Sequence, residues 1–229
     1  MTRFAERDDL LGLPVDVAPH LLGAQLITVV DGVETRLRIT EVEAYHGKGT
    51  GPVPDPGSHA RMGYTARNAT MWGESGHLYV YLSHGIHSCI NVVCGPAGEA
   101  GGVLLRAGEV VMGADAAAER RGVPTPLGRT ALRDLARGPG RLAKAMGVRH
   151  ALHDGIDIAS GTEMNGATAR LLLADELADV SAGPRVGIAG TAGTMAFPWR
   201  FWITGDPTVS PFRWGRGAAD AAAALQQAQ

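Results

Sequence analysis

The stretch Ile39-Thr-Glu-Val-Glu-Ala-Tyr45 alternates in character from one residue to the next. A period of two is typical of a β-strand, so Glu41, Glu43 and Tyr45 are predicted to share one face, with small and apolar residues on the other. Two carboxylates are poor core material, since a buried charge is costly unless it is paired. We therefore expect the charged face to line a cleft. The alternative is an ordinary solvated strand face.

The sequence that follows adds an imidazole to this group. A loop rich in glycine and proline, Gly47–Gly57, leads to Ser58-His59-Ala-Arg61. A carboxylate, a phenol and an imidazole thus lie within twenty residues of one another. These are side chains that enzymes use for proton transfer.

Composition limits the classes of protein to be considered. The chain has 229 residues, 45% of them hydrophobic, and a net charge of -2. This length fits one large domain or two small ones, and the net charge carries no global nucleic-acid signature. The only cysteines, Cys89 and Cys94, lie in an apolar run, which favours a reducing cytoplasm over a disulfide framework. The sequence shows no signal-peptide pattern and no apolar run that could span a bilayer, so no membrane association is expected.

Frequent glycine and proline predict many short elements, because 32 glycines and 13 prolines interrupt the chain. A helical turn is expected near Pro14–Leu22. The predicted strands are Gln25–Asp31, Glu34–Ala44, His77–Leu82, His87–Cys94, Gly102–Ala107, Ala167–Leu173, Arg185–Ala189 and Trp199–Thr204. The predicted helices are Glu109–Arg121, Thr130–Ala136 and Gly140–Met146. The tail Ala218–Gln229 is predicted to be a frayed helix or disordered. The order of elements indicates a mixed α/β domain without strict βαβ alternation.

Basic residues are concentrated in one segment. Between residues 120 and 149, eight basic residues accompany a single acid, Asp134; they are Arg120, Arg121, Arg129, Arg133, Arg137, Arg141, Lys144 and Arg149. Such a patch can bind a polyanion although the whole chain is acidic. Pro139 and Gly140 are predicted to begin a helix beside Arg141, and a helix start with a guanidinium can hold a phosphate. The alternative is a solvated helical face.

A β-hairpin is predicted around His84-Gly85. Tyr79 and Tyr81 share a face of its first strand, and Asn91 interrupts its apolar second strand. Arg106 likewise ends the apolar run Val103-Leu-Leu. Taken singly, each has a structural explanation: Tyr81 as a core aromatic and Asn91 as a hydrogen-bonded structural amide.

Other common sites find little support in the sequence. The run Gly183–Gly193 lacks the spacing of a dinucleotide fingerprint and the Lys-Ser/Thr of a phosphate loop. The eight histidines and two cysteines include no ligand pair with helical or knuckle spacing. We therefore expect no metal site and no cofactor.

Seven segments occur together in the order found in one family. They are Thr40-Glu-Val-Glu-Ala-Tyr45, Asp55-Pro-Gly-Ser-His59-Ala, Thr65-Ala-Arg67-Asn68-Ala-Thr-Met71, His77-Leu-Tyr-Val-Tyr81, Cys89-Ile-Asn91, Val103-Leu-Leu-Arg106-Ala and Gly138-Pro-Gly-Arg-Leu142. The chain resembles the alkyladenine (3-methyladenine) DNA glycosylases that lack a helix-hairpin-helix motif. Arg185-Val-Gly-Ile and Pro198-Trp-Arg-Phe-Trp-Ile203 resemble that family's closing strands. The resemblance covers roughly residues 10–210.

The resemblance implies an α+β fold, with a curved, mainly antiparallel sheet flanked by short helices. We expect one glycosylase domain over residues 1–229, with a core at 10–210 and a tail at 211–229. It implies an enzyme that flips alkylated or deaminated purines out of double-stranded DNA and hydrolyses the N-glycosidic bond. A monofunctional, monomeric, cytoplasmic protein is expected, and the lesion spectrum is left open.

The resemblance also implies roles for individual residues. Glu43 matches the carboxylate that activates water, and Arg106 matches an arginine that helps to place the water and the adjoining phosphate. Tyr45, His59 and Tyr81 match residues that stack on and hydrogen-bond the flipped base. Asn91 matches a residue that disfavours undamaged guanine.

Contacts with DNA outside the pocket follow from the same resemblance. Arg67, Arg141 and Lys144 are the residues expected to contact DNA phosphates. His84 stands where the family usually has a tyrosine that wedges into the minor groove. Because an imidazole is smaller than a phenol and can titrate, the strength of the wedge and its pH dependence are open.

Two alternatives from other classes remain. The chain could be a non-catalytic DNA-binding domain of the same fold, although Glu43, Tyr45, His59 and Arg106 are intact. It could also be a small-molecule nucleosidase, although a neutral sugar needs no basic patch.

Overall fold

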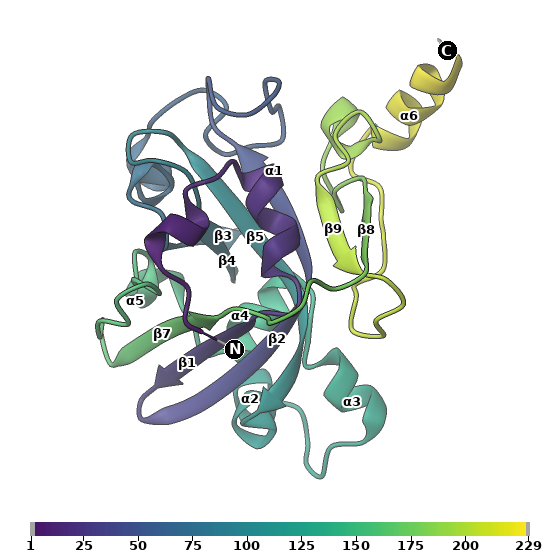
Figure 1. Cartoon of the computed structure of the whole chain (residues 1–229). Helices are drawn as coiled ribbons and strands as arrows, with labels where there is room; N and C mark the ends of the chain where they lie inside the picture. Colours follow the sequence, from purple (N-terminus) through teal and green to yellow (C-terminus); the bar gives the residue numbers. More distant parts are fainter. Residues whose placement is uncertain (1–2, 228–229) are drawn as a thin grey trace.

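The computed structural model describes residues 3–227. A nine-stranded sheet forms its centre, with strand order β3-β4-β5-β2-β1-β7, while β6 pairs with β5 and β9 pairs with both β2 and β8 (Figure 1). The strands are β1 Gln25–Val30, β2 Val33–His46, β3 Leu78–Ser83, β4 His87–Val93, β5 Gly101–Met112, β6 Ala136–Arg137, β7 Ala167–Leu172, β8 Val180–Gly183 and β9 Arg200–Ile203. All eight pairings are antiparallel. The predicted α+β class and mainly antiparallel sheet are confirmed.

Short helices flank the sheet. The α-helices are α1 Pro14–Val17, α2 Ala114–Arg121, α3 Arg129–Asp134, α4 Pro139–Ala145, α5 His150–His153 and α6 Ala218–Gln227. The 3-10 helices are η1 Arg7–Leu10, η2 Ala18–Leu21, η3 Ala66–Trp72 and η4 Gly190–Gly193. Glycine ends α2, since Gly122 adopts a left-handed φ of 68°. Among residues 3–227, no helix has both the length and the apolar character needed to cross a membrane.

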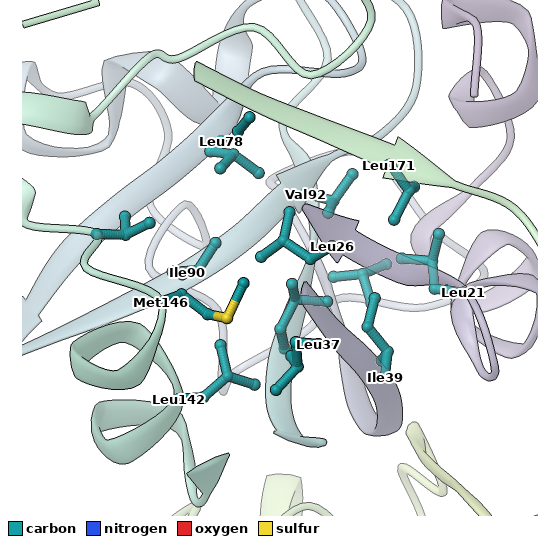
Figure 2. Packing of buried hydrophobic residues seen from close by; sticks show 14 of the residues in the cluster. Leu21, Leu26, Leu37, Ile39, Leu78, Ile90, Val92, Leu142, Met146 and Leu171 are labelled. Atoms are coloured by element: carbon teal, nitrogen blue, oxygen red, sulfur yellow. The ribbon is translucent and has the colours of Figure 1, made fainter. Parts of the chain in front are cut away.

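The central strand β2 runs the length of the core. Its apolar residues Leu37, Ile39, Val42 and Ala44 are fully buried, and Figure 2 shows Leu37 and Ile39 among the side chains of neighbouring strands and of the α4 segment. Register shifts against β5 interrupt the strand on both sides of Glu41. Such bulges bend a strand and redirect its side chains. Val42 and Ala44 face the core as the alternation predicted, but the bulges also place Ile39 in the core, although strict alternation put it on the face of Glu41.

Two predicted elements are wrong in position. Strand β5 continues to Met112, so the helix predicted from Glu109 begins only at Ala114. Glu109 and Val110 extend the pairing with β2, and Gly113 then turns the chain with a positive φ of 76°. The strand predicted at Arg185–Ala189 is absent from the structure. Instead β8, at Val180–Gly183, pairs with β9.

The other predicted elements are observed with shifts of a few residues. The tail forms α6 through Gln227, which contacts η4 and extends away from the sheet (Figure 1). The last two positions of the predicted tail lie outside the described residues. The assignment of the whole chain to one domain remains a prediction.

Candidate active site

Glu41 lies at the bulge of β2, with no exposed surface. Its Oε1 accepts hydrogen bonds from Arg106 Nε at 3.1 Å, Arg200 Nε at 2.7 Å and Ser210 Oγ at 3.0 Å, and its Oε2 accepts from Ser210 N at 2.7 Å. A carboxylate has about four acceptor sites. Glu41 is therefore saturated and acts as a structural anchor between β5 and β9.

Glu43, two residues along the same face, is also fully buried. Its Oε1 accepts from Val186 N at 2.6 Å, and its Oε2 accepts from Tyr45 Oη at 2.8 Å and Arg106 Nη1 at 3.3 Å. These three partners leave one acceptor site on Oε1. Glu43 is thus held in place by three donors, and its carboxylate can accept one further hydrogen bond. The alternative of a solvated strand face is wrong, because both carboxylates are buried and paired.

Arg106 bridges the two carboxylates from the neighbouring strand β5, and only 7% of its surface is exposed. Burial alone would lower its pKa, but the carboxylates of Glu43 and Glu41 outweigh burial and raise it. Its charge is therefore permanent and balances the acidic pair. A contact with DNA phosphate, implied by the resemblance, stays a prediction.

Tyr45, whose phenol donates to Glu43, lines a small aromatic cavity of about 60 Å³. Its lining residues are Tyr45, Gly57, His59, Met71, Tyr79, Tyr81, Asn91 and Ile188. The four predicted pocket residues, Tyr45, His59, Tyr81 and Asn91, thus lie together. The His59 and Tyr81 rings meet edge to face with centroids 4.5 Å apart. The cavity is small, so we expect a bicyclic base to displace side chains at its rim.

The pocket side chains differ in how firmly they are held. Asn91 is buried and donates from Nδ2 to the Tyr79 carbonyl at 3.1 Å. His59 is exposed at the rim; removal of water around its ring, with the charges of Arg67 and Arg61, lowers its pKa. Burial raises the pKa of Tyr79 to about 12. Burial, followed by the charge of Glu43, also raises the pKa of Tyr45, so this phenol stays protonated and can donate to Glu43.

The hairpin tip projects as predicted. His84 and Gly85 have positive φ values of 51° and 74°, and Ile86 N donates to the Ser83 carbonyl. These are features of a type I′ turn. The His84 side chain is exposed, and the neighbouring Ile86 is 72% exposed. Both are available to an external partner.

Only part of the basic segment has free charge. Arg120, Arg121 and Arg137 donate to protein oxygens, and Arg133 pairs with Asp134. Within residues 3–227, the exposed side chains of Arg141, Lys144 and Arg149 have no hydrogen-bond or ion-pair partner. Lys144 and Arg149 line a cleft of about 440 Å³ together with Ile86 and His87 of the hairpin. Lys144 and Arg149 therefore lie next to the hairpin, whereas the exposed Arg129 of α3 and Arg141 do not line this cleft.

Arg67, the third predicted phosphate contact, lies on η3. Its guanidinium donates to the Leu82 carbonyl of β3 at 3.4 Å. It is exposed and lies near the other residues of the rim. The prediction of its role is not tested by this arrangement.

Sequence reasoning missed two residues that pack behind the pocket residues Tyr45 and Gly57. Asp55 and Arg185 are both fully buried and form a two-pronged ion pair, with Nη1–Oδ2 at 2.8 Å and Nη2–Oδ1 at 2.7 Å. Both stand in motifs quoted above, but their separation of 130 residues hides the pair from any local pattern. The sequence offered one signal for this pair: each of the glycine-rich segments 47–57 and 183–193 contains a charged residue. No group of three or more His, Cys, Asp or Glu among residues 3–227 could hold a metal ion.

A buried, positioned carboxylate beside an aromatic cavity defines a hydrolase-like site for a planar ring. Comparison with known proteins identifies the family of the chain. The profile of the methylpurine-DNA glycosylase (MPG) family matches residues 9–207, and the chain belongs to that family. It is accordingly a DNA glycosylase, an enzyme of DNA repair.

Curated relatives cover most of the chain. A protein of Leifsonia xyli subsp. xyli is 48% identical over 90% of this chain and 92% of its own length. A protein of Streptomyces avermitilis is 47% identical over 87% of each chain, and one of Nocardia farcinica is 48% identical over 90% of each. The names of all three assign them provisionally to the 3-methyladenine DNA glycosylases.

Proposed function

We propose that the chain removes alkylated or deaminated purines from double-stranded DNA by hydrolysis of the N-glycosidic bond, with Glu43 as the general base. The carrying observation is the state of Glu43: it is fully buried and held by three donors, and one of these donors is the phenol of Tyr45, which lines the aromatic cavity. Glu41 has four donors, from Arg106, Arg200 and Ser210, and none of these residues lines the cavity. The two carboxylates, alike in sequence, thus receive different roles.

In the proposed reaction a water donates a hydrogen bond to Glu43 and attacks C1′ of the deoxyribose. Glu43 accepts the proton, the C1′–N bond breaks, and its electron pair leaves with the purine. An alkylated purine is already cationic, so it leaves neutral without protonation. The fixed charge of Glu43 also stabilises the oxocarbenium-like transition state. Arg106 holds the carboxylate and helps to place the water.

The base enters the aromatic cavity from the side of His59 in this proposal. We propose that His59 moves, because it is exposed on the loop after Gly57 while Tyr45 is buried. The flipped base then stacks on Tyr45 and Tyr81, each contact worth about 1–3 kcal/mol. Asn91, fixed by its bond to Tyr79, opposes the exocyclic amine of guanine.

The duplex lies against the hairpin in this proposal. His84 enters the minor groove. Arg67 of η3, together with Arg141 and Lys144 of α4, contacts phosphates. The free charges beside the hairpin support this placement. A monomeric, monofunctional enzyme that needs no cofactor and acts in the cytoplasm belongs to the same proposal.

The test is excision from duplexes that each carry one lesion, read as strand cleavage after alkali. Wild-type protein is expected to act, and Glu43→Gln to lose about 10²–10⁴-fold in single-turnover rate while it still binds lesion DNA. Glu109→Gln, at an exposed glutamate of β5, is the matched control and should retain activity. A Glu43→Gln rate within about tenfold of wild type would exclude Glu43 as the base. Competition by duplex DNA separates this function from that of a nucleosidase.

A further inference from the structure

The Asp55–Arg185 pair is expensive to bury, yet both side chains have no exposed surface. Arg185 also donates from Nη1 to the Ala44 carbonyl at 3.1 Å and from Nη2 to the Ala192 carbonyl at 3.3 Å. A Cβ at Gly57 would lie 2.7 Å from Nη2, so the loop packs directly on the guanidinium. Buried ion pairs are often no more stable than apolar replacements. Stability alone therefore does not explain the pair.

Arg185 is enclosed by aromatic rings. Its Cζ lies 4.6 Å from the ring centroid of Tyr45, 5.1 Å from that of Trp199 and 5.9 Å from that of Phe197. Tyr45 is the ring that also lines the base cavity. A guanidinium thus covers part of a ring that the proposed base would stack upon, and Asp55 neutralises that guanidinium from the other side.

Arg185 also reaches the catalytic carboxylate through the backbone. The next residue, Val186, donates its N–H to Glu43 Oε1 at 2.6 Å. The carbonyl that accepts from Arg185 belongs to Ala44, which lies between Glu43 and Tyr45. The Arg185 side chain therefore contacts the stacking ring and the backbone that follows Glu43, while the next residue holds the Glu43 carboxylate.

We propose that the Asp55–Arg185 pair is a positioning device that also sets substrate class, favouring cationic alkylated bases over neutral deaminated ones. This inference rests on the proposed function. A cation is attracted to the face of an aromatic ring, but a second, unbalanced cation against the same ring opposes it. The negative charge of Asp55 offsets the positive charge of Arg185. Tyr45 can then attract a cationic base while Arg185 holds the ring in place.

The first test is Asp55→Asn, assayed by single-turnover excision of 7-methylguanine and of hypoxanthine from otherwise identical duplexes. Asparagine retains the shape but leaves Arg185 unbalanced. We expect the rate ratio, 7-methylguanine over hypoxanthine, to fall about tenfold relative to wild type. A general loss of structure lowers both rates and leaves the ratio unchanged. A ratio within about twofold of wild type overturns the proposal.

The second test is the double variant Asp55→Asn/Arg185→Met, which removes both charges and remains informative if the single variant does not fold. It should lower both rates through lost positioning but return the ratio to the wild-type value or above. A double variant with a lowered ratio, or with both rates unchanged, overturns the inference. Asp157→Asn is the control, because it removes a carboxylate charge 2.8 Å from Arg7, which keeps Glu74 as a partner, at a pair that does not line the base cavity. Wild-type protein inactive on both lesions would refute the proposed function instead.

Discussion

His46 shows at the scale of one residue how burial shapes titration. It follows Tyr45 on β2, has no exposed surface, and neither ring nitrogen has a hydrogen-bond partner among residues 3–227. Burial lowers its pKa; the charge of Asp55 opposes this, and that of Arg185 adds to it. The folded protein therefore holds His46 neutral at pH values where an exposed imidazole would already take a proton.

This predicts a loss of stability in mild acid. Below about pH 6.5 the unfolded chain protonates His46 while the folded chain does not, so the free energy of unfolding falls as the pH falls. His46→Leu should keep the stability near pH 7 and reduce this decline, by about 1.4 kcal/mol for each unit by which the pKa was lowered. Urea denaturation at several pH values measures it. An identical pH dependence in wild type and variant would contradict the prediction.

The β3–β4 hairpin makes its prediction at the scale of an element. The turn holds His84 outward in a conformation that histidine tolerates better than most residues. If His84 fills the space left by the flipped base, His84→Tyr should shift the equilibrium toward the flipped state, because a phenol covers more of that space. A fluorescent base analogue in the duplex reports the unstacking. Unchanged or weaker flipping would remove the wedge role from His84.

Helix α4 carries the electrostatic prediction. Arg141 and Lys144 have no protein partner among the described residues, so each is free to pair with a phosphate. Arg141→Ala should weaken DNA binding and reduce the slope of log K against log salt by about 0.9. Arg133→Ala is the control, since Arg133 already pairs with Asp134 at 2.8 Å. Equal slopes for wild type and Arg141→Ala would place the DNA face elsewhere.

Elements with a regular pattern could be predicted, and those defined by distant partners could not. The alternation gave the right faces for residues 42–45, but it could not foresee the bulges at Glu41, which place Ile39 in the core together with Val42. The end of β5 was missed because Glu109–Met112 has no apolar alternation of its own and is held by its pairing with β2. Residues 185–189 resemble a strand in composition, yet Arg185 is drawn into its pair with Asp55.

The same limit applies to the site. Glu43 and Tyr45 lie close together in sequence, so their shared face was predictable from the strand period. The difference between Glu41 and Glu43 was not, because it depends on Arg200, Ser210 and Val186, which lie 143–169 residues away. No local rule separates a saturated carboxylate from one with an open acceptor site.

For the whole molecule we predict catalysis without a metal and without a covalent enzyme–DNA intermediate. The chain has two lysines, Lys48 and Lys144, and neither lines the base cavity. A Schiff base with C1′ needs such an amine. EDTA should leave excision unchanged, and borohydride should trap no protein–DNA adduct. Trapping, or loss of activity in EDTA, would reverse this prediction.

The strand β2 pairs with β1, β5 and β9, which has a consequence for how the chain is made. A ribosome delivers Glu41 long before Arg200 and Ser210, its partners 159 and 169 residues later. Contacts this distant close slowly, because the chain entropy of a long loop is lost before they form. We expect the amino-terminal strands to collapse first. The hydrogen bonds of Glu41 to Arg200 and Ser210 should form last. A nascent chain would therefore complete the carboxylate cluster only after Ser210 has left the ribosome.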